Sequence, residues 1–572
     1  MPGKKIVILG AGYSGVHAAK ILSKLSSPCN IEVTLINKTP YHFLLTELHE
    51  VAGNRIDADA VKISLERVFK KTSVKIVEDT ITEVDFKNQR LSSAKGQYSY
   101  DYLILAFGSE PAFFGIQGIA ENAFTLWSLE DALKIKHQII DMFHTASKES
   151  DKSKRRELLT FTVGGGGFTG IEMMGELVQW VDELCIQYSI DRTEVKLIII
   201  EALSKILTSI TDKSIKKSVV FLNKNGVEVL TDSPITKVTD NLIELKTGRI
   251  IPTRTLIWTG GIQNNSLSEK LVIKLGKRGR IETNDYMQSL NYKNVYVVGD
   301  NVSYNDSKCG NLPPLVEVAL QTADFAAKNI INDIQGKEKE KFVSNLHGVM
   351  VSIGGGYSVS EVGVLKLSWI FSDLMKHFIN VHYLFGVGGL SFVWDYIIDN
   401  FLRDKKRRTF AGGLLYGKSS GLWLTALRMF LGIMWLKSGI EKIQAGWLSS
   451  DILSTSASTT LIGPSTPGWY AGFIKSFVIP NATSFQAVIT ITELLLGTAL
   501  FFGALTALAA FGSIVMDLNF FLSGSGDWWF LITSIIILFS NAGIYFGADY
   551  FIIPLLKNWF KLDYKKYSIN KK

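Results

Sequence analysis

Short apolar runs alternate with amphipathic stretches over roughly the first 335 residues, a pattern typical of βαβ units. Strands are expected at Ile6–Leu9, Ile31–Ile36, Tyr102–Ala106, Leu158–Val163, Val195–Ile200 and Thr255–Gly261. The last three repeat the succession of the first three, so the sequence predicts a second βαβ unit inserted into the first.

The pattern changes after about residue 340. Two helices are predicted at Leu365–Phe378 and Ser391–Leu402, and the second has Asp395 and Asp399 opposite its apolar residues. Those apolar residues are Phe392, Val393, Trp394, Ile397, Ile398 and Phe401. Such helices pack on a domain or lie in a membrane interface, and the basic linker that follows favours the interface.

Four apolar stretches then follow, each close to the about 20 residues that cross a hydrocarbon core. Membrane spans are expected at 422–443, 484–503, 504–523 and 528–547. The loop Ser449–Pro467 carries almost no charge, so it is expected on the outer side. The sequence therefore predicts a multi-pass protein of the cell membrane.

The composition also separates the α/β part of the chain from the apolar C-terminal part. Only ten of the 130 residues from Gly421 to Tyr550 are charged, and seven of the twelve tryptophans lie beyond position 420. The net charge of +8 is concentrated in blocks beside the spans, at Lys405–Arg408 and Lys557–Lys572. Basic flanks indicate the cytoplasmic side of a membrane rather than a nucleic-acid partner. No signal peptide precedes the first strand, so the α/β part is expected in the cytoplasm.

Charged residues expected to be buried at or near membrane depth are Arg428, Lys442, Glu493, Asp517 and Asp549, the last just beyond the fourth stretch. Charged groups at this depth are costly and usually face a partner or a site. Mutual pairing inside a bundle and a ligand site remain equal alternatives.

The three cysteines, Cys29, Cys185 and Cys309, form no CxxC motif. This argues against a redox-active disulfide and against a metal cluster, and inert thiols are favoured.

Two glycine-rich motifs carry the chemistry. VILGAGYSG (Val7–Gly15) and TVGGGGFTGIE (Thr162–Glu172) each end a strand and open a helix. Glycines there permit a tight turn, so a pyrophosphate can lie on the helix N-terminus. One such motif is weak evidence, but two imply two bound dinucleotides. A third motif, VYVVGDN (Val295–Asn301), completes the pattern usual for a flavoprotein in which NAD(P)H delivers hydride to FAD.

The residues after the strands refine the cofactor assignment. Asn37 follows the first unit's second strand and can still bond a ribose hydroxyl, so FAD is compatible. Glu201 is the counterpart in the second unit, and its carboxylate would repel a 2′-phosphate, which favours NADH over NADPH. The expected FAD residues are Gly10, Gly12, Tyr13, Ser14, Gly15, Asn37, Lys38, Thr46, Ala106, Gly108, Gly299 and Asp300. The expected NADH residues are Gly165, Gly167, Phe168, Thr169, Gly170, Glu201 and Gly260.

Residues 1 to about 402 resemble the type II NADH:quinone oxidoreductases, single-subunit FAD enzymes that do not pump protons. The resemblance rests on GAGYSG, YHFLLTELHEVA (Tyr41–Ala52), GGGFTGIE and VVGD, and it continues through VSIGGG (Val351–Gly356), Lys376 and VGGL. It implies a glutathione-reductase-like α/β fold with two dinucleotide-binding domains, and a quinone as electron acceptor.

Family roles then fall on particular residues. Thr46 resembles the residue that contacts the flavin ring, Glu172 the acid beside the nicotinamide, and Lys376 a lysine near the quinone tunnel. The family's quinone motif typically has two glutamines one helical turn apart. This chain has LVEVALQ (Leu315–Gln321), so Gln321 is kept but Glu317 replaces the first glutamine. Because of this replacement, the sequence predicts a quinone site but does not determine which type of quinone binds there or how tightly.

Residues 421–572 resemble the DoxX family of four-helix membrane proteins, through RMFLGIMWLKSGIEKI and ELLLGTALFFG. The fusion is similar to dehydrogenases that feed menaquinone-type carriers. The expected domains are FAD-binding (1–115 and 266–335), NADH-binding (116–265), a membrane-docking and quinone-site region (336–402), a basic linker (403–420) and an all-α four-helix transmembrane bundle (421–572).

The sequence therefore predicts a membrane-bound NADH:quinone oxidoreductase with FAD and NADH as cofactors and no metal. Glu172, Glu317, Gln321 and Lys376 are its candidate catalytic residues. Sulfide:quinone and thiosulfate:quinone oxidoreductases, or a flavin sensor anchored to a membrane partner, remain alternatives. The oligomeric state is left open, a homodimer included.

Overall fold

The computed structural model describes residues 3–363, 365–402, 421–450, 452, 462–463, 466–524, 526–540, 542–544 and 546–559. The chain divides into two compact units, Met1–Tyr416 and Gly417–Lys572. The expected linker 403–420 with its basic block, most of the loop Ser449–Pro467 and the basic tail from residue 560 lie outside the described residues.

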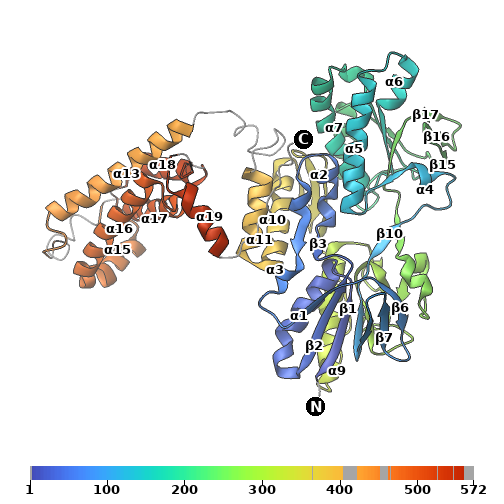
Figure 1. Ribbon diagram of the computed structural model, residues 1–572, viewed down its shortest axis with the longest axis horizontal. Helices are drawn as coiled ribbons and strands as arrows, with labels where there is room; N and C mark the ends of the chain where they lie inside the picture. The colour runs from blue at the N-terminus through green and yellow to red at the C-terminus, as the bar shows by residue number, and fades with distance from the viewer. Residues whose placement is uncertain are drawn as a thin grey trace. The chain divides into compact units, whose positions relative to one another are not determined.

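The first unit is built on two five-stranded sheets (Figure 1). Four strands follow the same order in both, but the fifth, at one edge, is the last strand of the first sheet in chain order and the first strand of the second. In the first sheet the order is β5 (Lys75–Glu78), β2 (Ile31–Asn37), β1 (Lys4–Leu9), β9 (Tyr102–Leu105) and β21 (Val295–Val297). In the second it is β14 (Val227–Leu230), β13 (Lys196–Ile200), β12 (Thr160–Gly164), β18 (Thr255–Trp258) and β11 (Phe124–Thr125). Every neighbouring pair in both sheets is parallel. The prediction of two βαβ units is confirmed.

Helices cover these sheets because their apolar residues need a partner surface. On the first sheet, α1 (Tyr13–Cys29) packs against α9 (Val316–Ile334). On the second lie α5 (Leu129–Ala146), α7 (Phe168–Tyr188) and α8 (Asp212–Lys224). A large apolar core runs through the first unit, and a second cluster fills the space between the second sheet and the β-strands at residues 235–252.

Smaller elements fill the edges of the first unit. The short sheets pair β3 (Tyr41–Phe43) with β4 (Lys62–Ser64), β6 (Ile81–Asp85) with β7 (Arg90–Ser93) and β8 (Gln97–Ser99), β10 (Ser109–Pro111) with β19 (Ile262–Asn264), and β15 (Ile235–Val238) with β16 (Leu242–Leu245) and β17 (Ile250–Pro252). The short helices are α2 (Leu48–Ala52), α3 (Leu65–Phe69), α4 (Ile119–Asn122) and α6 (Lys152–Leu158). Leu158, expected in a strand, therefore ends a helix instead.

The region after residue 340 departs from the sequence prediction. A three-stranded antiparallel sheet comes first, with β25 (Gly348–Ser352), β26 (Ser358–Val362) and β27 (Leu365–Ser368). The expected helix Leu365–Phe378 is wrong in its first residues, because Leu365–Ser368 pair with β26. The helix α10 begins at Ile370 and runs to Gly388, and it is followed by α11 (Leu390–Ile397) and one π-helical turn (Ile398–Leu402).

The buried face of α11 also differs from the predicted one. Phe392, Tyr396 and Asn400 are buried at four-residue spacing, whereas Trp394 is exposed. Asp395 is bound by Arg67, 2.9 Å away.

The second unit is helical, with α13 (Gly421–Gln444), α15 (Gly468–Phe473), α16 (Ala482–Phe502), α17 (Thr506–Ser523), α18 (Trp528–Leu538) and α19 (Asp549–Trp559). Helix α13 packs on α16, and α17 packs on α18. Among the described residues, two helical segments are long and apolar enough to cross a membrane, Gly468–Phe502 and Thr506–Ser523.

The other two expected spans differ from the prediction. Helix α13 has the length of a span, with 24 residues, but it carries four charged side chains. The fourth expected span, 528–547, is helical only over the 11 residues of α18. At about 1.5 Å per residue this is roughly half of a hydrocarbon core. The chain turns after Leu538, and Asp549 accepts the backbone N–H groups of Leu505 and Thr506.

Candidate functional site

The first glycine turn joins β1 to α1. Gly10 has a φ of +105°, which only glycine adopts without strain. A Cβ on Gly15 would overlap the carbonyl oxygen of Gly10, so only glycine lets the helix approach the strand this closely. A Cβ on Gly12 would meet nothing within 4 Å. The turn therefore leaves open space in front of the helix.

The second turn, between β12 and α7, repeats this geometry residue by residue. Gly165 has a φ of +109°. A Cβ on Gly170 would overlap the Gly165 carbonyl oxygen, and a Cβ on Gly167 would meet nothing within 4 Å. Gly260, expected on the NADH side, packs against Gly165.

Both turns fit a dinucleotide pyrophosphate. Gly12 and Gly167 are the N-cap residues of α1 and α7, and neither N-terminus has a side-chain cap. The amide N–H groups of each first turn, which include Tyr13 and Ser14 in α1 and Phe168 and Thr169 in α7, therefore face open space. Such N–H groups with the positive end of a helix dipole bind phosphate. The donor set matches two dinucleotides, as the sequence predicts.

The residues after the second strands occupy matching places. The Ala11 N–H donates to Asn37 Oδ1 at 3.0 Å in the first turn. In the second turn the Gly166 N–H donates to Glu201 Oε2 at 2.6 Å. Each side chain therefore anchors its own glycine turn. Lys38, next to Asn37, is exposed.

Other expected FAD residues lie around the first sheet. The Tyr13 hydroxyl and Thr46 Oγ1 are 3.0 Å apart. The Gly108 N–H donates to Asn301 Oδ1 at 2.9 Å, which joins the end of β9 to the motif after β21. Ala106, at the end of β9, lies against the site of a Cβ on Gly15.

Asp300 lies in the third motif, just after Gly299, whose φ is +66°. The Ser109 hydroxyl donates to Asp300 Oδ2 at 2.7 Å. Burial raises the pKa of the Asp300 carboxyl. A polar ligand that donates a hydrogen bond to this carboxylate would lower that cost.

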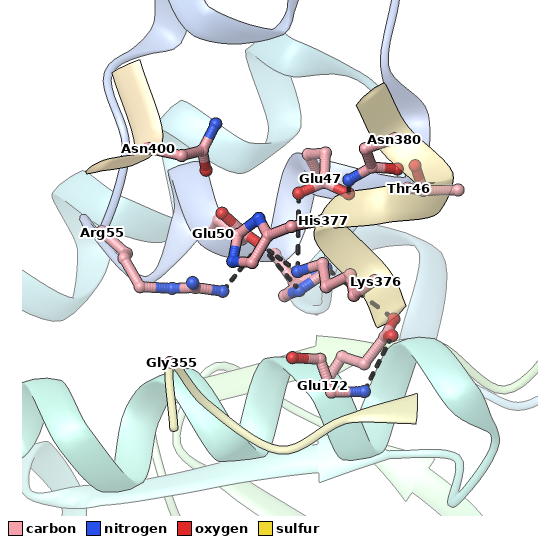
Figure 2. A network of polar contacts seen from close by, with 12 residues as sticks. Thr46, Glu47, Glu50, Arg55, Glu172, Gly355, Lys376, His377, Asn380 and Asn400 are labelled. Atoms are coloured by element: carbon pink, nitrogen blue, oxygen red, sulfur yellow. Dashed lines mark hydrogen bonds and ion pairs between the residues drawn. The ribbon is translucent and has the colours of Figure 1, made fainter. Parts of the chain in front are cut away.

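Glu172 and Lys376 come together in a buried network of charges (Figure 2). Lys376 of α10 donates to Glu50 of α2, and its Nζ lies 3.5 Å from Glu47 Oε2. Glu172 of α7 lies 3.7 Å from His49 Nδ1 and accepts the Ser352 N–H at 3.3 Å. Three chain segments that are far apart in sequence thus meet at one place.

Burial sets the protonation of this network. It raises the pKa of Glu172 to about 8, although the charge of Lys376 opposes that shift. Lys376 keeps its proton because Glu47 and Glu50 raise its pKa against the cost of burial. At neutral pH Glu172 therefore holds a proton much of the time, as a residue that exchanges protons at this pH must.

Glu317 and Gln321 lie one turn apart on α9, as expected, but both bind the chain just before β25. Glu317 pairs with the His347 imidazole and accepts the His347 N–H at 3.1 Å. Gln321 donates to the Asn345 carbonyl oxygen at 2.7 Å and accepts the Asn345 N–H at 2.9 Å. The two side chains thus hold one backbone segment.

Sequence reasoning missed most of the buried network. Arg55 binds both oxygens of Glu176, at 2.9 and 3.0 Å, and lies 2.7 Å from Glu50. Glu172 and Glu176 are four residues apart in the first half of α7, among mostly apolar residues, a spacing that could have indicated a shared buried partner. Arg55 and Glu50 gave no such signal.

The ionisable residues of the second unit mostly have protein partners. Lys442 lies 2.8 Å from Glu493, and Arg428 donates to the carbonyl oxygens of Ala542 and Phe546. Asp517 is buried beside Ser534, 3.4 Å away. The ion pair between Lys442 and Glu493 therefore explains why these two charged residues lie among apolar helices.

Comparison with known proteins places both units. A family model described as pyridine nucleotide-disulphide oxidoreductase matches residues 4–323, and one described as DoxX matches residues 423–523. The chain is 31% identical over 393 residues to the type II NADH:quinone oxidoreductase of Staphylococcus aureus, which covers 68% of this chain and 96% of that protein.

Solved structures share the fold of the first unit. The NDH2 of Plasmodium falciparum in complex with NADH has a TM-score of 0.62 at 18% identity, over 69% of this chain and 98% of that one. A sulfide:quinone oxidoreductase from Aquifex aeolicus has a TM-score of 0.58 at 17% identity, over 68% of this chain and 92% of that one.

Proposed function

Because the chain belongs to the type II NADH:quinone oxidoreductases and carries a DoxX domain, we propose that it passes electrons from NADH through FAD to a menaquinone-type quinone. The observation that carries this proposal is the pair of glycine turns, each open in front of an uncapped helix. Bound FAD would supply the hydride and electron chemistry, and the protein aligns and tunes it.

Glu201 selects the electron donor. Its carboxylate lies beside the second glycine turn, at the end of β13, where a ribose hydroxyl would reach it. NADH is therefore the donor, and the additional phosphate of NADPH is repelled.

Glu172 and Lys376 serve the flavin and quinone side. Lys376 is protonated before the quinone reacts and can bond a quinone oxygen, while Glu172 can exchange a proton near neutral pH. We place the nicotinamide beside Glu172 and the quinone nearer Lys376, as the family resemblance implies.

The region 336–402 docks on the membrane. One face of α10 exposes large apolar side chains, while its opposite face carries Lys376 and Asn380 into the buried network. The exposed side chains of α10 and its flanks are Trp369, Phe371, Leu374, Phe378, Phe385 and Leu390. A helix with these two faces lies in a membrane interface, where a quinone can enter from the bilayer.

The DoxX-like unit anchors the protein as a multi-pass membrane domain, with the flavin unit on the cytoplasmic face. Apolar side chains such as Val488, Leu495 and Leu508 are exposed on α16 and α17, whereas Glu493 and Asp517 are buried. This inverted distribution suits lipid. The basic flanks of the spans give the orientation.

Sulfide and thiosulfate oxidation gain no support. Cys185 and Cys309 are free thiols on separate elements, Cys185 buried in α7 and Cys309 close to Ser344. A redox-active cysteine pair is therefore not formed by these two residues.

The purified protein should be yellow, release FAD on heating and oxidise NADH with menadione as acceptor. Sulfide and thiosulfate should not reduce the flavin. Release of FMN, or flavin reduction by sulfide in place of NADH, would contradict the proposal. Size-exclusion chromatography in detergent will show whether a homodimer forms.

Substitution at Glu317 tests the quinone side. Glu317→Ala should leave FAD content and flavin reduction by NADH intact while slowing reoxidation by menadione, because α9 loses its tie to His347. Glu317→Gln restores the family's usual residue and should retain more activity. Slower flavin reduction with unchanged reoxidation would place Glu317 on the nicotinamide side instead.

A further inference from the structure

Two carboxyl groups meet inside the buried network, on either side of the first turn of α2. Glu47 is 3% exposed and Glu50 is fully buried. Lys376 reaches both carboxyl groups, because it donates to Glu50 and its Nζ lies 3.5 Å from Glu47 Oε2. Two buried carboxylates that share one ammonium group repel each other, which favours a proton on one of them. Among the described residues, Glu47 Oε2 and Glu50 Oε2 are both buried without a hydrogen-bond partner.

Glu47 is the member of the pair that keeps the proton. Glu50 has Arg55 at 2.7 Å and accepts from Lys376, and these two cations hold its pKa well below the usual range. Burial and the neighbouring Glu50 raise the pKa of Glu47 to about 7. The charged and titratable groups that face Glu47 are Glu50, Arg55, Lys376, Glu172, Tyr13 and Tyr396.

Polar side chains continue from Glu47 along α10 and α11. Asn380 Nδ2 donates to Glu47 Oε1 and also to the Tyr396 hydroxyl, both at 3.0 Å. The Tyr396 hydroxyl lies 2.8 Å from His377 Nδ1, and His377 Nε2 lies 3.8 Å from Asp373. The His377 and Asp373 side chains are 14% and 12% exposed, so this row of groups reaches the surface.

We propose that Glu47 stores the proton that quinone reduction consumes. Glu47 passes this proton to Lys376 and is reprotonated from the surface by way of His377 and Tyr396. This inference rests on the proposed function and adds a residue to it. Asn380 is a positioning residue that holds Glu47 beside Tyr396 and carries no proton itself.

The proton balance requires such a store. NADH gives up a hydride, which carries two electrons and one proton. The quinone takes up two electrons and two protons to become a quinol, so each turnover needs one more proton. In the proposed step the Glu47 O–H bond breaks, its proton replaces the one that Lys376 gives to a quinone oxygen, and the carboxylate is reprotonated from water.

The competing explanation is purely structural, since the same contacts tie α2, α7 and α10 together. Two substitutions separate the explanations. Glu47→Gln keeps an acceptor for Asn380 but cannot release a proton. Glu176→Gln removes a buried carboxylate from the same network, where Arg55 is its bound cation. A structural role predicts similar effects from both.

The experiment uses the full-length holoenzyme in detergent under anaerobic conditions. NADH is mixed with the enzyme and flavin absorbance is followed, and the reduced enzyme is then mixed with menadione. In the wild type, reoxidation should slow as the pH rises through about 7, because Glu47 then loses its proton. Glu47→Gln should slow reoxidation at least about tenfold at low pH and flatten its pH dependence, with flavin reduction by NADH unchanged.

Two further measurements do not depend on turnover. The infrared difference spectrum between oxidised and reduced holoenzyme should contain the carbonyl band of a buried carboxylic acid, and Glu47→Gln should lose it. Glu176→Gln should keep both this band and the pH profile, although it unfolds at a lower temperature. Tyr396→Phe should slow reprotonation while leaving the band in place.

The outcomes are distinct. Equal slowing of both half-reactions in Glu47→Gln and Glu176→Gln, or a wild type without a redox-dependent carboxylic acid band, would overturn the proton store. A wild type whose flavin is not reduced by NADH, or not reoxidised by menadione, would instead overturn the proposed function.

Discussion

The two glycine turns share one backbone and differ in one acceptor. Gly10 and Gly165 have φ values of +105° and +109°, and a Cβ on Gly12 or Gly167 would meet nothing within 4 Å. The side chain that holds the turn is a neutral amide in the first case, Asn37, and a carboxylate in the second, Glu201.

Under the proposed function, the first turn holds a bound cofactor, FAD, and the second a substrate, NADH, which leaves after each turnover. The side-chain amide of Asn37 is hydrogen-bonded within the protein, since Nδ2 donates to the Thr39 carbonyl oxygen at 2.8 Å and to that of Tyr41 at 3.3 Å. Glu201 also accepts the Leu203 N–H, but it remains an anion. A resident cofactor needs a rigid cradle, whereas a substrate that comes and goes needs a charge that rejects its phosphorylated analogue.

The largest effect should come from filling the open space of each turn. Gly12→Ala should fold, because φ there is −71° and no protein atom lies within 4 Å of the added Cβ, but it should lose FAD. Gly167→Ala, where φ is −73°, should also fold; it should keep FAD and bind NADH poorly. A methyl group against a pyrophosphate should cost on the order of 3 kcal/mol. Flavin absorbance and the KM for NADH measure the two outcomes. Loss of FAD from Gly167→Ala would show that the turns are not separate sites.

A smaller effect is expected from removing the charge at the second turn. Glu201→Gln keeps an oxygen for the Gly166 N–H but no longer repels a phosphate. The preference for NADH over NADPH in kcat/KM should fall by about 2 kcal/mol, or roughly 30-fold. Glu228→Gln on the neighbouring strand, where Arg249 pairs with the carboxylate, is the matched control and should not change the preference. Equal kcat/KM values of the wild type for NADH and NADPH would show that Glu201 does not contact the ribose of the bound nucleotide.

The smallest effect should follow from giving the first turn the charge of the second. Asn37→Asp keeps an acceptor for the Ala11 N–H but places a carboxylate against the carbonyl oxygens of Thr39 and Tyr41. The protein should lose about 1 kcal/mol of stability, seen as a lower melting temperature with FAD still bound. An unchanged melting temperature would mean that the amide donor contributes nothing.

Sequence patterns predicted what depends on neighbours in the chain. The strands that precede both turns and the open glycines follow from local spacing. The places of Asn37 and Glu201 after the second strands were also predicted, but the hydrogen bonds by which they hold the glycine turns were not. The failures involve distant partners. Leu365–Ser368 became a strand because β26 was available to pair, and α18 ended at Leu538 as the chain turned to bring Asp549 to α17.

The sequence by itself determined the two nucleotide folds and the apolar C-terminal helices, because each follows from a run or motif of adjacent residues. The candidates Glu172 and Lys376 came from the family resemblance. Only the tertiary structure decided how Glu47, Glu50, Arg55 and Glu176 share charge around Lys376. These groups come from three segments of the chain, and their pKa values depend on burial and on partners that no local pattern records. The same reason explains why Glu317 and Gln321 could be placed on one helix face from the sequence, while their common partner before β25 could not.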